Sequence, residues 1–247
     1  MRRVIVTVIA LSALGTSIAS AADMPVKARP MLPIAPTWTG FYIGGEIGGA
    51  WGHEVGSTVF TTAFSTAGSQ TPGDISGVLG GLEIGYNYQV APSWVIGVDA
   101  DWLWTNTKGS TSRAGNIAGV IMNGGTSVHW YATVTGRVGY AVNDWLLYGK
   151  GGAAFSSADY NGNATFNGVV VENATNTVHR TGWTAGAGVE KKLQMISPNL
   201  TAKLEYDYLD FGTDRILFTF PGFGVNGADT TTHVHVVKAG LGFLLNP

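Results

Sequence analysis

The amino-acid sequence predicts an all-β protein, an eight-stranded antiparallel up-and-down transmembrane β-barrel. Three observations lead to this prediction. Apolar and polar residues alternate with a period of two in eight segments, short and long connections alternate between these segments, and aromatic residues recur ten positions apart on one face. No segment sustains the 3.6-residue period that is typical of an amphipathic helix.

Residues 1–22 have the pattern of a secretory signal peptide. Two arginines follow the initiating methionine, an apolar core runs over Val4–Ile18, and small residues come after it. Small residues occupy the cleavage positions of such signals, so we expect cleavage after Ala21 or Ala22. An uncleaved membrane anchor is the alternative, but the apolar run ends in serine and alanine rather than in a basic stop.

Residues 23–38 are expected to form a periplasmic linker, and residues 39–247 the barrel. Four of the nine prolines lie in the linker segment, which shows no period. Such a composition favours an extended, partly polyproline-like chain. A disordered mature N-terminus would have the same composition.

The composition excludes several classes of protein. The chain has no cysteine, which rules out disulfides, a thiol catalyst and a cysteine-ligated zinc site. Charged residues make up 12% of the chain and the net charge is −2, so no basic surface for nucleic acid is present. After the signal segment, no uncharged apolar stretch is long enough for a membrane helix. A mature chain that crosses a membrane must therefore do so as a closed barrel.

The period-two segments give the expected strands. They span 39–52, 76–90, 93–106, 127–142, 144–157, 177–193, 199–211 and 232–246. Prolines 72, 92, 198 and 221 lie outside them and proline 247 is the last residue, as strands require.

The connections between these segments alternate in length. Those at Pro92, at Asn143–Asp144 and over 194–199 are short. The long ones are rich in Gly, Ser, Thr and Asn and span 53–75, 107–126, 158–176 and 212–231. Short turns at one end and long loops at the other are typical of bacterial outer-membrane barrels.

The two faces of each segment differ in chemistry. Segment 39–52 places Phe41 and Trp51 on one face and Glu46 on the other. Segment 128–142 has Val128 and Trp130 on its apolar face, and His129, Tyr131 and Arg137 on the polar face. A soluble lipocalin-like barrel would turn the apolar face inward. An eight-stranded interior is too narrow for so many tryptophans, which favours an apolar face that contacts lipid.

The aromatic residues are spaced as two membrane girdles. Ten residues at about 3.3 Å each, tilted by about 45°, rise by roughly 23 Å, close to the apolar band of about 25 Å in outer-membrane barrels. The aromatics expected at the lipid interfaces are Phe41, Trp51, Trp94, Trp104, Trp130, Tyr140, Trp145, Phe155 and Phe243.

The other face carries charges of both signs. The residues expected in the lumen are Glu46, Glu83, Asp99, Asp101, Arg137, Lys150, Glu190, Lys203, Glu205, Asp207 and Lys238. Pairing of the first and last strands should place Lys238 beside Glu46. Isolated buried charges are costly, so we predict a salt-bridged network that fills the lumen. An ion path with a selectivity filter is the alternative.

Two groups of residues near the long-loop end are candidates for a metal or heme site and for a hydrolytic site. His53, His233 and His235 are weak candidates for a rim metal or heme site, because imidazole binds Zn, Cu, Ni and Fe. Polar residues at the membrane–water boundary would give the same pattern. Ser127 and His129 are expected on one inward face, but no orienting carboxylate or oxyanion hole for a hydrolase is identifiable.

Three stretches resemble a known family. They are "ADMPVKA" after the predicted cleavage site, "WTGFYIGGEIGGAWG", and "HVHVVKAGLGFLL" near the C-terminus. They resemble the small outer-membrane immunogenic proteins of alphaproteobacteria. This porin-like family of eight-stranded barrels is related to the barrel domain of outer-membrane protein A, and some members are called hemin-binding proteins. The resemblance implies an integral outer-membrane protein of a Gram-negative bacterium that supports envelope integrity and displays surface loops.

The C-terminal assembly signal of such barrels maps onto Lys238, Gly240, Phe243 and Leu245. This sequence has Leu245 where an aromatic residue is usual, and Asn246–Pro247 extends beyond the signal. The two departures bear on recognition by the barrel-assembly machinery and not on the fold.

We therefore expect a non-enzymatic, structural outer-membrane protein with at most narrow porin-like activity. The alternative is a surface receptor that binds heme, a metal or a host ligand through its extracellular loops. We expect no cofactor. The expected partners are outer-membrane lipid, lipopolysaccharide and the barrel-assembly machinery.

Overall fold

The computed structural model describes residues 37–59, 70–220 and 224–245. All of them belong to one compact unit, residues 35–247. The predicted signal peptide, the predicted linker up to residue 36 and the Asn246–Pro247 tail lie outside the described residues. Within the described ranges, no helix is long and apolar enough to cross a membrane.

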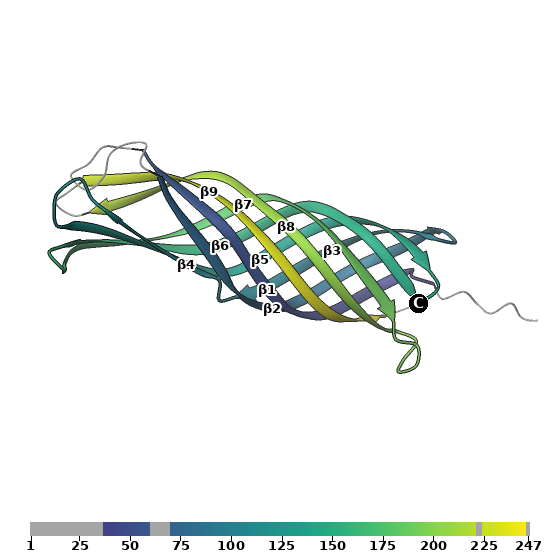
Figure 1. The fold of residues 1–247 in the computed structure, drawn as a ribbon. Helices are drawn as coiled ribbons and strands as arrows, with labels where there is room; N and C mark the ends of the chain where they lie inside the picture. The colour runs from purple at the N-terminus through teal and green to yellow at the C-terminus, as the bar shows by residue number, and fades with distance from the viewer. Residues whose placement is uncertain (1–36, 60–69, 221–223, 246–247) are drawn as a thin grey trace, which may run out of the picture. The chain divides into compact units, whose positions relative to one another are not determined.

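Strands dominate the described chain (Figure 1). They are β1 (Gly40–Thr58), β2 (Gln70–Ala91), β3 (Trp94–Thr105), β4 (Lys108–Ala114), β5 (Val120–Val142), β6 (Trp145–Phe166), β7 (Val169–Lys192), β8 (Leu200–Phe220) and β9 (Gly224–Leu244). Every pairing between them is antiparallel.

The sheet closes on itself because β1 pairs with both β2 and β9. The β1–β9 ladder runs from the pair Tyr42–Leu244 to the pair Thr58–Ala228. Closure removes the two free edges that an open sheet would present. Each backbone polar group in the ring can then be satisfied by a neighbouring strand, as a lipid environment demands.

The ring counts as eight strands, because β3 and β4 are two segments of one interrupted strand. Both pair with β2 on one side and β5 on the other. The ladder is interrupted at Asn106 and Thr107, where the Asn106 amide still donates to the Val78 carbonyl at 3.2 Å. The predicted fold class is confirmed: an antiparallel, up-and-down barrel of eight strands.

The strand limits that the sequence predicts are wrong at the long-loop end. The segments predicted as loops over 53–75, 107–126, 158–176 and 212–231 are in large part strand, and they form the extended hairpins of Figure 1. Above the aromatic residues both faces of a strand meet water, so the contrast between its faces fades while backbone pairing continues. Periodicity therefore underestimates strand length there.

The β6–β7 hairpin shows this most clearly. Phe166 pairs with Val169, so only Asn167 and Gly168 form the turn. Both have positive φ, 48° and 82°. Two such residues make the type I′ turn, which matches the twist of paired strands and favours Asn-Gly. The Asn-Gly dipeptide is thus the sequence signal that identifies this turn.

A β-bulge in β5 reverses the predicted faces at its start. Val128 pairs with Ala158 and Trp130 with Ser157, which leaves His129 as the extra residue. An extra residue shifts the two-residue alternation by one. Val128 is therefore buried and His129 exposed, the opposite of the predicted assignment, and Ser127 shares the outer face with His129.

Around the ionic residues of the lumen, apolar and charged residues take opposite sides of the ring. Ile47 and Leu82 are 72% and 60% exposed, whereas Glu46 and Glu83 beside them are 3% and 6% exposed. The same alternation continues along β9, where Val237 is exposed and Lys238 fully buried. The predicted orientation, with the apolar face outward, is the one the structure has.

Closure should depend on Gly48, whose missing side chain lets β9 approach. A Cβ atom at Gly48 would overlap the Val237 carbonyl oxygen and the Lys238 backbone, whereas one at Gly49 would lie 3.7 Å from the Gly77 oxygen. We expect Gly48→Ala to lower the free energy of unfolding by about 1–3 kcal/mol, the usual cost of overpacking. Urea titration of the barrel in detergent micelles, followed by the gel shift between folded and unfolded forms, measures this.

Gly49→Ala is the matched control for that variant. Its added methyl group points to the lipid side, and we expect a change within about 0.5 kcal/mol. Equal unfolding midpoints for the two variants would contradict the role given to Gly48.

Candidate functional site

The barrel interior is filled in layers, from the hairpin end to the short-turn end. A cavity lies among the hairpins, an apolar layer follows, an ionic network comes next, and an aromatic cluster occupies the short-turn end. The inward residues of β3 follow this order, because Val95 lies at the short-turn end, Asp99 and Asp101 follow, and Leu103 lies above them. Inward residues recur every two positions along a strand, so they reach successive heights of the interior, and each layer combines inward residues of several strands.

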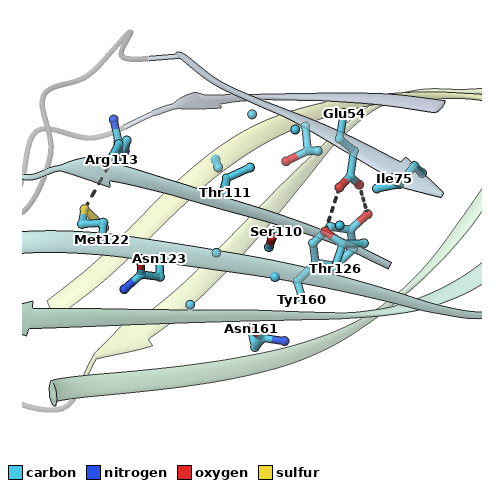
Figure 2. Close-up of a pocket in the computed structure, with 18 of the residues that line it drawn as sticks. Glu54, Ile75, Ser110, Thr111, Arg113, Met122, Asn123, Thr126, Tyr160 and Asn161 are labelled. Carbon is cyan, nitrogen blue, oxygen red and sulfur yellow. Dashed lines mark hydrogen bonds between the residues drawn. The ribbon is translucent and has the colours of Figure 1, made fainter. Parts of the chain in front are cut away.

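The cavity among the hairpins has a volume of about 160 Å³. Figure 2 shows Arg113 toward one end of the lining and Glu54 toward the other. The Arg113 guanidinium donates to Thr58 Oγ1 at 3.1 Å and contacts Met122 Sδ at 3.9 Å. Much of the remaining lining is glycine, serine, threonine and asparagine.

Glu54 forms the floor of this cavity. Its carboxylate accepts hydrogen bonds from Thr126 Oγ1 at 2.7 Å, Tyr160 Oη at 2.5 Å and Thr232 Oγ1 at 3.1 Å. Burial and the adjacent carboxylate raise the pKa of Tyr160, which keeps its hydroxyl protonated as a donor. The Arg180 guanidinium lies 5.2 Å from the Tyr160 ring centroid and donates to Thr232. The floor is therefore a buried, hydrogen-bonded polar cluster.

An apolar layer separates this polar floor from the ionic network. It is one contiguous cluster of buried residues that includes Leu79, Leu103, Tyr131, Leu209, Phe211, Val234 and Val236. The Tyr131 and Phe211 rings are stacked across the lumen with their centroids 6.2 Å apart. Such a layer excludes water from the section of the barrel that it fills.

The eleven charged residues predicted in the lumen all lie on the inner face. Their side chains are at most 7% exposed. Lys238 is at the centre and is 0% exposed. Its Nζ lies 3.2 Å from Glu46 Oε1, 3.1 Å from Asp101 Oδ2, 2.9 Å from Glu205 Oε1 and 3.3 Å from Asp207 Oδ2.

Two further lysines join the same carboxylates. Lys150 Nζ lies 2.8 Å from Asp99 Oδ2, 3.0 Å from Asp101 Oδ2 and 2.9 Å from Glu205 Oε1. Lys203 Nζ lies 3.0 Å from Glu46 Oε2, contacts Glu83, and lies 3.8 Å from Glu205 Oε2. Glu205 thus contacts all three lysines and links strands β6, β8 and β9.

Arg137 extends the network toward the short-turn end. Its Nη1 lies 3.5 Å from Glu190 Oε2, and its Nε donates to Asn87 Oδ1 at 2.8 Å. The guanidinium lies between two rings, 4.5 Å from the Tyr42 centroid and 5.0 Å from that of Tyr148. Cation–π contacts in a desolvated site stabilise the buried charge further.

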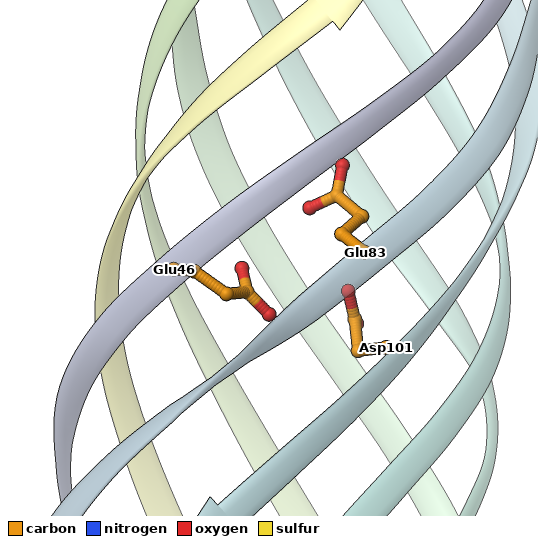
Figure 3. Close-up of side chains that lie close together, drawn as sticks. All are labelled: Glu46, Glu83 and Asp101. Atoms are coloured by element: carbon orange, nitrogen blue, oxygen red, sulfur yellow. The ribbon is translucent and has the colours of Figure 1, made fainter.

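Carboxylates outnumber cations among the eleven residues, seven against four. Three of the carboxylates, Glu46, Glu83 and Asp101, point toward one another from β1, β2 and β3 (Figure 3). Their nearest oxygens lie within 4.8 Å of one another, a spacing that could hold a metal ion. Lys203 and Lys238 contact the same carboxylates, so ammonium groups already supply positive charge there.

Trp38 closes the short-turn end of the interior. Its ring is fully buried in a cluster with Val95, Leu146 and Tyr148, and Lys192 Nζ lies 4.9 Å from its centroid. Trp38 is the last residue of the predicted linker, and the sequence prediction missed its place inside the barrel. Its position in phase with inward-facing Gly40 and Tyr42 is the signal that could have revealed it.

The predicted interface aromatics all lie on the outer face. Phe41, Trp94, Tyr140, Trp145 and Phe243 are at the short-turn end, and Trp51, Trp104, Trp130 and Phe155 are toward the hairpins. Contacts across strands join members of each girdle to outward aromatics that the sequence prediction omitted. The Phe41 ring lies 4.7 Å from that of Tyr86, and the Trp130 ring 4.6 Å from that of Trp102.

The residues of the predicted assembly signal split between the two faces of β9. Lys238 is in the ionic network, whereas Phe243 and Leu245 are exposed on the outer face. Gly240 faces inward, and a Cβ atom there would lie 3.0 Å from the Gly45 carbonyl oxygen. The small residue therefore fits the close approach of β1.

The Ser127–His129 pair does not form a hydrolytic site. His129 Nε2 lies 2.9 Å from Asp159 Oδ2, so a carboxylate does orient the imidazole. Hydrogen bonds from Thr177 and His129 lower the pKa of Asp159. In the described part of the chain no hydrogen bond joins Ser127 to His129, and both lie on the outer face rather than inward as predicted.

His53, His233 and His235 also lie on the outer face. His53 pairs directly with His233 across the β1–β9 ladder. His235 stacks on Trp51, with ring centroids 5.8 Å apart. The structure therefore brings the two strands of the predicted rim site together at the upper girdle.

Comparisons with known proteins agree with this geometry. The sequence profile of a family described as "Outer membrane protein beta-barrel domain" matches residues 8–243. The 31 kDa outer-membrane immunogenic protein of Brucella melitensis is 30% identical over 241 residues, which cover 94% of this chain and 96% of that protein. The 22 kDa outer membrane protein of Rhizobium leguminosarum bv. viciae is 30% identical over 193 residues, covering 77% of this chain and 70% of the other.

A solved structure shares the fold. The outer membrane protein OprG of Pseudomonas aeruginosa superimposes with a TM-score of 0.50 over 83% of this chain and 97% of OprG, at 14% sequence identity. At that identity the likeness concerns the fold alone.

The ionic network should contribute strongly to stability through Lys238. Replacing it by Met leaves four carboxylates without the central cation, and breaking a buried ion pair costs about 3–5 kcal/mol. We expect Lys238→Met to lower the free energy of unfolding by that amount and to reduce the temperature of the heat-induced gel shift.

Lys108→Met is the matched control, since Lys108 is exposed on β4. Its effect should stay within about 0.5 kcal/mol. If the two variants unfold at the same temperature, the network does not stabilise the barrel in the way its geometry indicates.

Proposed function

The chain belongs to the outer membrane protein β-barrel domain family, and on this premise we propose that it is a structural protein whose lumen is closed to solutes. Its fold and its relatives make it an integral outer-membrane protein. The proposal concerns what it does there: it stabilises the envelope as a filled, rigid cylinder and displays its long hairpins at the cell surface.

The layered interior is the observation that carries this proposal. An ion entering the lumen would meet the apolar layer around Leu103, Tyr131 and Phe211, and then the ammonium group of Lys238 held by four carboxylates. Displacing these pairs means desolvating charges inside a space with little water. An eight-stranded barrel is also only wide enough for its side chains to fill it.

The names of the relatives support the surface role. Two of the similar Brucella proteins are described as outer-membrane immunogenic proteins, which suits surface display of the hairpins. The outward aromatics would contact membrane lipid and lipopolysaccharide, and the exposed end of β9 would meet the barrel-assembly machinery. The proposed role includes no catalysis.

The cavity among the hairpins supports a second candidate function, a surface receptor. Its volume of about 160 Å³ is well below the roughly 300–1,000 Å³ of sites for drug-sized ligands. With Glu54 and Arg113 in its lining it would suit a small polar molecule better than heme. Isothermal titration of small zwitterions and polyols against wild type and Glu54→Gln tests this candidate.

The closed lumen predicts a specific result in planar lipid bilayers. Wild-type protein should give no large, stable conductance steps, because the apolar layer and the ionic network lie in series. The double variant Tyr131→Ala, Phe211→Ala removes the stacked rings and should show brief, small openings. Val237→Ala, which changes only the lipid-facing side, should behave as wild type.

Large stable steps from the wild-type protein would refute the closed lumen and favour the porin alternative.

The envelope role is tested separately, by the permeability of the outer membrane. A strain that lacks the protein should admit bulky antibiotics that the intact outer membrane excludes, and wild-type protein should restore the barrier. Unchanged permeability in that strain would contradict the structural role.

A further inference from the structure

Four side chains form a continuous row across four adjacent strands on the outer face of the barrel. Asp74 on β2 pairs with His53 on β1, His53 pairs with His233 on β9, and His233 pairs with Asp210 on β8. The row therefore reads Asp, His, His, Asp, with the two imidazoles in the middle and a carboxylate at each end. Neither histidine is part of the lumen network or of the hairpin cavity.

The row is accessible to ions from solution. The His53 and Asp74 side chains are 71% and 81% exposed, and those of His233 and Asp210 are 40% and 20% exposed. His53 comes two residues after Trp51 on the same face of β1, so the row lies just beyond the upper aromatic girdle, at the polar boundary of the membrane.

The flanking groups hold both imidazoles by the same nitrogen. Asp74 contacts Nδ1 of His53, and Nδ1 of His233 lies 3.5 Å from Asp210 Oδ1 and 3.0 Å from Tyr208 Oη. An ionised carboxylate only accepts hydrogen bonds, so a neutral His53 carries its proton on Nδ1 and has a free lone pair on Nε2. The same tautomer lets His233 donate from Nδ1 to Tyr208 Oη, with Asp210 beside it.

This is the arrangement in which proteins present histidine to a metal. Metal-binding imidazoles almost always donate their second ring N–H to a carboxylate or carbonyl, which fixes the tautomer and raises the basicity of the ligating nitrogen. In the described part of the chain, the Nε2 atoms of His53 and His233 have no hydrogen-bond partner. Residues directly opposite across an antiparallel ladder have their Cβ atoms about 4.5–5.5 Å apart, so both rings can reach one ion.

We propose that His53 and His233 form a surface site for one divalent transition-metal ion, bound through both Nε2 atoms, with Asp74 and Asp210 as positioning residues. Imidazole ligands select Zn²⁺, Ni²⁺ or Cu²⁺ over Mg²⁺ and Ca²⁺. Water completes the coordination, as in sites that keep open positions. His235 is not in the ligand set, because its partner across the β1–β9 ladder is Trp51, on which it stacks, and not a second histidine. The site goes beyond the structural role and does not depend on a closed lumen.

Titration of the untagged, refolded protein in detergent micelles with Zn²⁺ and Ni²⁺ tests the site. Calorimetry should show one ion per barrel. His53→Ala and His233→Ala should each abolish the binding, and Asp74→Asn should weaken it by about tenfold or more, because it removes the group that orients His53. With Cu²⁺, electron paramagnetic resonance should report two nitrogen ligands.

His179→Ala is the matched control, since His179 is an exposed outer-face histidine that contacts Trp130 instead of a second histidine. It should bind as wild type does. The gel shift between folded and unfolded forms confirms that every variant is a closed barrel. Three results would each overturn the proposal: no Zn²⁺ or Ni²⁺ binding by wild type, binding that survives in the double variant His53→Ala, His233→Ala, or equal loss in His179→Ala.

Discussion

The pairing of β1 with β9 is the constraint on which the rest of the structure depends. It joins the first and last strands of the chain over a long ladder and leaves the ring without a free edge. Once eight strands close the ring, its interior has a fixed and small width. The side chains that point inward must then fill that width, and those that point outward must suit lipid.

The inward charges follow from this geometry. Seven carboxylates and four cations share a narrow space, so each cation contacts at least one carboxylate, and Glu205 contacts three lysines. Apolar side chains above and Trp38 below separate the network from water. The ion pairs of the network join strands that are distant from one another in the ring. The apolar layer excludes water and dissolved ions that would screen these ion pairs. A filled cylinder of this kind suits a structural role better than a pore.

Much of the fold could be predicted from the sequence, because lipid imposes a strict alternation on each strand. The alternation, the narrow interior of an eight-stranded barrel and the charges on the polar face together assign Phe41, Glu46 and Trp51 to the faces that they occupy. The prediction was wrong where lipid no longer acts: the extended hairpins lie in water, and their Thr- and Asn-rich strands lack a distinct apolar face. It was also wrong at His129, because a bulge shifts the alternation and leaves no mark in the residue pattern. The Asp–His–His–Asp row depends on the register between β2, β1, β9 and β8, which period-two patterns in single strands do not fix.

The central claim is that each strand turns its apolar side to lipid and its other side to a packed interior. Val236 and Val237 test it most directly, because they are identical neighbours on β9 with 0% and 37% exposure. Spin labels placed at the two positions in lipid vesicles can be compared by their collision rates with oxygen and with a water-soluble nickel complex. The account predicts frequent oxygen collisions at Val237 and little access for either reagent at Val236. Lipid-like access at Val236 with a protected Val237 would contradict it.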